Sequence, residues 1–137
     1  MVESKILKLL QQKALEVIND NKFVKCLNVN YNPPANKRWW EVVYIPNNVE
    51  NEFWDTGKTY KGIFRLILHW PQNNQGIYKP MEEAERVAKG FPKGLKLCDT
   101  INGITVTIIE QPDCQNIIES EGELLIGLTI KYLYFTL

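Results

Sequence analysis

The side chain with the clearest potential for catalysis is the single histidine of the chain, His69, in the stretch KGIFRLILHWP that spans residues 61–71. A catalytic histidine needs partners, such as a nucleophile in a strained turn or further metal ligands. No G-x-S-x-G motif occurs, and Ser4 and Ser120 are the only serines. Because the stretch alternates like a strand, we interpret His69 as a structural residue on the more polar face of a sheet.

The other potentially reactive residues also form no recognised catalytic or binding motif. Cys26, Cys98 and Cys114 are widely spaced and form no C-x-x-C pair, which favours free thiols in a reducing compartment over a metal site. The tripeptide GKT at 57–59 lacks the earlier glycine of a phosphate-binding loop and precedes a strand pattern. We therefore expect no enzyme activity, no cofactor and no metal.

A cluster of carboxylates in the second half of the chain resembles an acid–base site only superficially. Glu82, Glu83 and Glu85 are followed at helical spacing by Arg86 and Lys89. Side chains three or four residues apart on a helix form ion pairs, so the cluster is typical of a solvated helix face.

The bulk composition limits the possible function classes. The chain has 137 residues, of which 45% are hydrophobic, and sixteen basic residues balance sixteen acidic ones. This predicts a single domain over 1–137 and argues against long-range attraction to nucleic acid or lipid. The charged N-terminal segment is not a signal peptide, and no run approaches the roughly 20 apolar residues of a membrane helix. We expect a soluble, intracellular protein.

Two helices and five strands follow from the periodicity. Residues 2–20 repeat apolar side chains at helical spacing, and a second helix is expected over 80–91, with Pro80 in its first turn. Alternating or β-branched runs predict the strands, at about 38–45, 59–70, 95–101, 104–109 and 123–137. The order predicts an α+β fold, a mostly antiparallel sheet of about five strands with two helices packed on one face.

Two connections receive specific predictions. Asn102-Gly103 is expected to form a two-residue hairpin turn that pairs Ile101 with Ile104 on the core face. The segment 47–58 is expected to be a long loop after Pro46, which cannot continue a central strand. Residues 111–122 break the alternation and are expected to be irregular.

The predicted sheet has more apolar surface than two helices can cover. The strand at 38–45 carries Trp39 and Val43 on one side and Trp40 and Val42 on the other, and the last strand is also apolar on both faces. Surplus apolar surface indicates a protein partner, and copies of the same chain are one candidate.

The segment from Tyr44 to Phe91 (YIPNNVENEFWDTGKTYKGIFRLILHWPQNNQGIYKPMEEAERVAKGF) resembles the tail terminator, or tail completion, proteins of long-tailed phages. The shared order is a strand ending in Tyr-Ile-Pro, a loop, a strand ending in Trp-Pro, a short loop, and a helix leading into Gly90-Phe91. The N-terminal helix, the hairpin and the last strand also match that order.

The resemblance implies a structural virion protein of the phage or prophage tail, made in the bacterial cytoplasm. It implies a ring, typically a hexamer, that caps the tail tube, ends tube polymerisation and forms the surface for head–tail joining. The implied partners are further copies, the tail tube protein and a head–tail connector protein. DNA would only pass through the lumen, and no membrane is involved.

Two loops are the expected assembly contacts, because loops on a rigid sheet often carry binding residues. The proposed contact residues are Glu50, Glu52, Phe53, Trp54, Asp55, Lys58, Asn73, Asn74 and Tyr78. Phe53 and Trp54 could instead fold back on their own core. Two other functions stay open, namely another phage neck protein such as a connector, and a small-molecule binding domain with a cavity that uses Tyr60, Trp70 and Tyr78.

Overall fold

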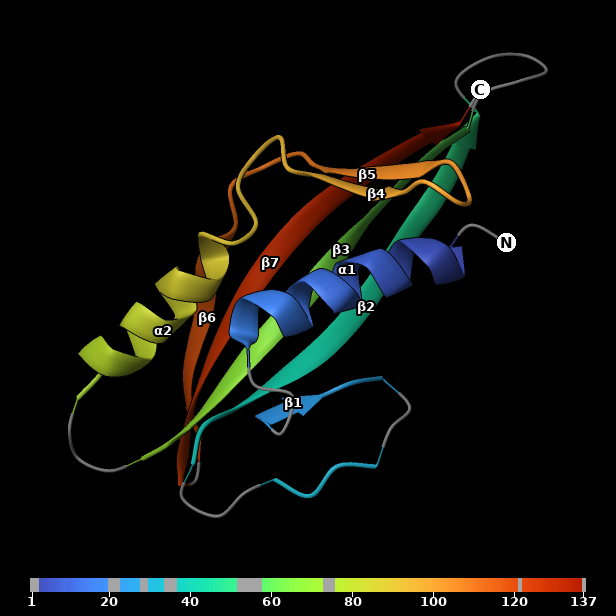
Figure 1. Ribbon diagram of the computed structural model, residues 1–137. Coiled ribbons are helices and arrows are strands. Elements are labelled where there is room, and N and C mark those ends of the chain that lie inside the picture. The colour runs from blue at the N-terminus through green and yellow to red at the C-terminus, as the bar shows by residue number, and fades with distance from the viewer. Residues whose placement is uncertain are drawn as a thin grey trace.

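A curved sheet with two helices on one face makes up the computed structural model (Figure 1). The structure describes residues 3–19, 23–27, 30–33, 37–51, 58–72, 76–120 and 122–136. The helices of the described chain are α1 (Glu3–Ile18) and α2 (Tyr78–Ala88). Its strands are β1 (Val24–Lys25), β2 (Trp39–Asn51), β3 (Lys58–Pro71), β4 (Lys96–Asp99), β5 (Ile104–Ile108), β6 (Asp113–Ser120) and β7 (Glu123–Thr136). Neither described helix is long and apolar enough to span a membrane.

The seven described strands form one sheet in the order β1-β2-β3-β7-β5-β4, with β6 also paired to β7. β3 pairs with β7 along its whole length, whereas the other edge of β7 is divided between two strands. β6 takes the first half of that edge, and β5 pairs with Tyr132 and Leu133 in the second half. β7 is therefore the strand on which the sheet is organised.

The α+β class and the two helices on one face are confirmed, but about five strands was too few. β1 has two residues, too short to give a periodic signal, and its parallel pairing with β2 makes the sheet mixed. β6 was expected to be irregular. Its register shifts between Gln115 and Ile118, and this bulge interrupts the alternation that identifies a strand.

The core lies between the helices and one face of the sheet, which we call the inner face. α1 buries one stripe at helical spacing, and α2 buries a second beside it. The stripe residues are Ile6, Leu10, Ala14 and Ile18 of α1, and Ala84, Val87 and Ala88 of α2. They meet alternate residues of the central strands, among them Phe64, Leu66 and Leu68 of β3 and Ile126, Leu128 and Ile130 of β7. Figure 1 shows both helices in front of this face.

Two glycines permit close packing in this core. A Cβ at Gly62 of β3 would meet the ring and hydroxyl of Tyr132, which lies across it and donates to the Tyr44 hydroxyl at 2.8 Å. A Cβ at Gly90 would lie 2.5 Å from the Val17 methyl groups of α1. The second contact sets how closely the end of α2 approaches α1.

The strands β2 and β3 extend further than expected. β2 continues past Pro46 to Asn51, and its pairing with β3 shifts register between Pro46 and Val49. A proline without an N–H is tolerated next to such an irregularity. The expected loop over 47–58 is therefore wrong for residues 47–51 and 58, while residues 52–57 lie outside the described parts.

The hairpin between β4 and β5 has a four-residue connection, so the expected two-residue turn is wrong. Asp99, not Ile101, pairs with Ile104, and Ile101 is 93% exposed. The Asp99 carboxylate accepts hydrogen bonds from the Asn102 side chain at 2.7 Å and from the backbone N–H groups of Asn102 and Ile101. These bonds lower the pKa of Asp99. A carboxylate just before the loop that accepts hydrogen bonds from the N–H groups of the loop stabilises this longer connection.

Candidate assembly surface

The face of the sheet opposite the helices, which we call the outer face, carries apolar side chains beside charged ones such as Glu41, Arg65 and Lys131. The large apolar side chains on this face are half-buried rather than buried. They are Trp39 and Val43 of β2, Ile63 and Ile67 of β3, and Leu125 and Leu133 of β7. Strand alternation assigns them to this face, since their neighbours in sequence form the core. An apolar surface of this kind fits a protein contact.

His69 is the centre of a polar network on the outer face. Its Nε2 lies 2.9 Å from Glu41 Oε1, and its Nδ1 lies 3.2 Å from Glu123 Oε1. The Trp39 ring stacks on the imidazole at 3.7 Å between centroids and an interplanar angle of 7°. Lys25 Nζ approaches the other Glu41 oxygen at 3.8 Å. The network thus joins β1, β2, β3 and β7.

The geometry of the His69 network indicates a structural role rather than a metal site. The two carboxylates face different ring nitrogens, so a single ion cannot contact both carboxylates and the ring. Within the described parts of the chain, no group of three histidine, cysteine or acidic side chains is placed to hold a metal. A ring protonated at both nitrogens donates to both carboxylates, whereas a neutral ring donates to one. The position of His69 on the face away from the core agrees with the sequence interpretation, although the residue is 8% exposed and well connected.

A second network joins the helices to β2. Glu83 of α2 accepts from Arg86 Nε at 2.7 Å and from Arg38 Nε at 2.9 Å. Arg86 also donates to the Val17 carbonyl at the end of α1. Burial raises the pKa of Glu83, but the Arg86 hydrogen bond and the charges of both arginines outweigh it, so the pKa is lowered overall. The expected pairing of a glutamate with Arg86 thus occurs, and it ties the two helices and the start of β2 together. The expected solvated helix face is wrong for Glu83, whose side chain is 10% exposed, whereas Glu82 and Glu85 are exposed.

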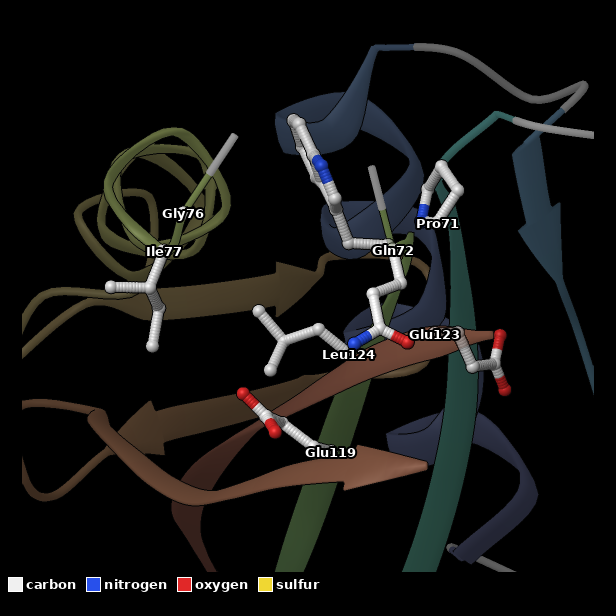
Figure 2. A pocket seen from close by; sticks show the side chains of 8 residues that line it. Pro71, Gln72, Gly76, Ile77, Glu119, Glu123 and Leu124 are labelled. Carbon is white, nitrogen blue, oxygen red and sulfur yellow. The ribbon is translucent and has the colours of Figure 1, made fainter. Parts of the chain in front are cut away.

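A hollow of about 480 Å³ lies where the end of β3 meets α2 and the β6–β7 turn (Figure 2). Its lining residues are Trp70, Pro71, Gln72, Gly76, Ile77, Glu119, Glu123 and Leu124. In Figure 2 the Glu119 carboxylate points toward the space between Ile77 and Leu124, and Glu123 points away from it. Tyr60 and Tyr78 are not among the lining residues, so the three aromatics of the predicted ligand cavity do not converge.

Comparison with known proteins decides the family. The family model of the phage tail terminator protein matches residues 5–132. The chain belongs to the phage tail terminator family. This confirms the resemblance inferred from the sequence and gives the chain a structural role in a phage tail, in contact with other tail components.

The fold of this family member is also found among solved structures. One of them superposes with a TM-score of 0.70 at 14% sequence identity, over 93% of this chain and 94% of the other. At that identity the match supports the shared fold alone. No curated protein sequence matches the chain.

The predicted contact residues that the structure describes, Glu50, Lys58 and Tyr78, lie near opposite ends of β3. Glu50 and Lys58 lie where β2 and β3 meet, and their side chains are outside the described parts, as are Glu52, Phe53, Trp54 and Asp55. Asn73 and Asn74, beyond the other end of β3, are also outside them. Tyr78, the first residue of α2, is 79% exposed. The fourteen residues of β3 separate the two groups by roughly 40 Å.

An exposed region that the sequence reading missed lies on β6. Ile117 and Ile118 are 42% and 51% exposed, and Ile118 pairs with Leu125 at the border of the outer face. Two adjacent isoleucines within a polar segment are the signal that could have identified it.

On the same strand, burial and then the charges of Glu85 and Asp113 raise the pKa of the Cys114 thiol, which makes it a weak nucleophile.

Proposed function

We propose that the protein caps the end of the phage tail tube as a ring of identical subunits and thereby ends tube polymerisation. The family match over residues 5–132 is the observation that carries the proposal. The capped end then provides the surface to which the head, or its connector protein, is joined. The proposed ring is a hexamer, and it is not an enzyme.

A ring cap needs two different kinds of contact. Subunits contact each other through unlike surfaces, which allows closure by rotation, and the ring presents one end to the tube and the other to the head. The apolar side chains of the outer face support a protein-contact role, because Ile67 and Leu125 are half-buried rather than buried. The zero net charge fits a lumen through which DNA passes without being held.

The two ends of β3 are proposed as the contacts with the tube and the head. The first end includes Glu50, Glu52, Phe53, Trp54, Asp55 and Lys58, and the second includes Asn73, Asn74 and Tyr78. Two contact regions at opposite ends of a subunit would suit a ring held between two larger assemblies. The 79% exposure of Tyr78 supports its availability for such a contact.

Tail assembly in the presence and absence of the protein tests the proposal. Purified tube protein is polymerised from tail tips with the protein added at increasing concentration, and tube lengths and ends are measured by electron microscopy. We expect a ring-shaped density at one tube end and an arrest of elongation. Unchanged tube growth with bare ends would contradict tube capping, and head binding to uncapped tubes would instead favour a connector.

A further inference from the structure

The described sheet has open edges at β6, at β4 and at the β1–β2 border. β6 pairs with β7 on one side, and no described strand pairs with its other side. On the opposite border of the sheet, β1 covers β2 only at Trp40 and Glu41, and beyond Glu41 no described strand pairs with that side of β2. Backbone N–H and C=O groups along such edges are available to another strand.

The β6 edge, residues 113–120, combines exposed apolar and acidic side chains. Ile117 and Ile118 are its apolar residues. Asp113 and Glu119 are exposed at its two ends, Asp113 on the outer face and Glu119 on the inner face, where it lines the hollow beside α2. Glu85, exposed on the neighbouring helix α2, adds negative charge near Cys114. A partner surface for this edge should therefore be basic and partly apolar.

The opposite border, which we call the β1–β2 edge, has that character. It consists of residues 23–27, Lys37 and the uncovered side of β2. Lys25 has 42% of its side chain exposed, and its 3.8 Å contact with Glu41 leaves the ammonium accessible. The exposed Lys37 has its Nζ 5.9 Å from the centre of the Phe23 ring. Leu27, which is 39% exposed, supplies apolar surface next to β1.

The two edges also match in level along the strands. One line of Cα partners crosses the whole sheet, through Lys25, Glu41, Ile67, Gly127 and Gln115. Lys25 is thus level with the centre of the β6 edge, between its two carboxylates, Asp113 and Glu119. A neighbouring copy placed beside the sheet without a vertical shift would bring opposite charges to the same level.

We propose that the β6 edge of one subunit packs against the β1–β2 edge of a second copy of this chain. The inference rests on the proposed ring and names the contact that would build it. Because the edges are opposite borders of one sheet, the contact is heterologous, as a ring requires. β2 and β6 run in opposite directions, since three antiparallel pairings separate them. Copies in the same orientation would therefore extend the sheet in an antiparallel manner.

Variants that block one edge each provide the test. Ile118→Asp blocks the β6 edge, and the double variant Lys25→Glu with Leu27→Asp blocks the β1–β2 edge. Ile101→Asp and Lys93→Glu make the same chemical changes at exposed positions outside both edges. Circular dichroism and the unfolding midpoint establish that each variant is folded. Assembly is measured by light scattering, and also on purified tail tubes, under the condition in which the wild-type protein assembles.

We expect each edge variant to raise the concentration needed for assembly at least about tenfold, and the two controls to leave it unchanged. Mixing the two edge variants should give a 1:1 dimer and nothing larger, because one intact contact remains and neither outer edge can bind again. Assembly of Ile118→Asp like that of Ile101→Asp, or a mixture that stays monomeric, would overturn this contact while the ring stands. A wild-type protein that assembles neither alone nor on tubes would overturn the proposed function itself.

Discussion

The two faces of the sheet are built from the same strands, yet they differ in composition and burial. On β3, Leu66 is fully buried under the helices, while the next residue, Ile67, is half-buried on the outer face. The inner face is completed by the chain's own helices. On the outer face, the His69 network links β1, β2, β3 and β7, and the apolar side chains stay half-buried. The stability of the fold therefore depends more on the inner face than on the outer one.

The largest expected effect separates the two faces directly. Leu66→Ala should lower the free energy of unfolding by about 2–5 kcal/mol, because it leaves a cavity in the closed core. Ile67→Ala, a matched change one residue away, should cost about 1 kcal/mol, because solvent already reaches that side chain. Urea unfolding of both variants measures the difference. Equal losses would show that the outer face is as closed as the inner one.

A smaller effect is expected at the centre of the outer face. His69→Ala should cost about 1–3 kcal/mol, since it removes the partner of Glu41, of Glu123 and of the Trp39 ring. Assembly should remain intact, because His69 is 8% exposed and offers little surface to a partner. Complementation of a terminator-deficient phage provides the readout. A folded variant that yields no infectious particles would show that His69 has a role beyond holding the strands together.

The smallest effect concerns the network on the helix side. The pKa of Glu83 is lowered in the folded protein, so its carboxylate stabilises the fold above the ordinary glutamate pKa of about 4.3, and this contribution is lost as the pH falls further. Glu83→Gln should therefore cost about 1 kcal/mol at pH 7 and little near pH 3. Denaturant unfolding of both proteins at the two pH values checks this. A difference that does not change with pH would mean that the charge of Glu83 is unimportant.

The sequence was sufficient to predict the elements whose apolar periodicity continues over many consecutive residues. α1, α2, β3 and β7 each repeat apolar side chains over ten or more residues, so their existence and their buried faces were predictable. The prediction of a two-residue hairpin turn was wrong although Asn102-Gly103 carries a strong turn preference. Asp99, three residues before Asn102, accepts hydrogen bonds that stabilise a longer loop. The turn preference of Asn102-Gly103 was thus outweighed by the side chain of Asp99, which lies outside the two-residue turn.

The candidate surface was harder to predict because it depends on pairings between distant segments. The apolar side chains on both faces of β2 and β7 could be counted from the sequence, and those on the outer face are half-buried in the structure. The unpaired strand edges could not be predicted from the sequence. They follow from β6 binding to β7 and from β1 stopping after two residues, neither of which has a periodic signal. The partners of His69 lie 28 and 54 residues away in the chain.

The central position of β7 has a consequence for synthesis. β7 follows the other described strands in the chain, yet β6 pairs with it alone, and β3 and β5 meet only through it. Before β7 leaves the ribosome, the nascent chain holds only the β1–β2–β3 and β4–β5 units, and long-range pairing of this kind forms late. A chain interrupted before β7 would lack the strand that unites these units. Incomplete translation products would thus be unable to enter a growing virion as defective subunits.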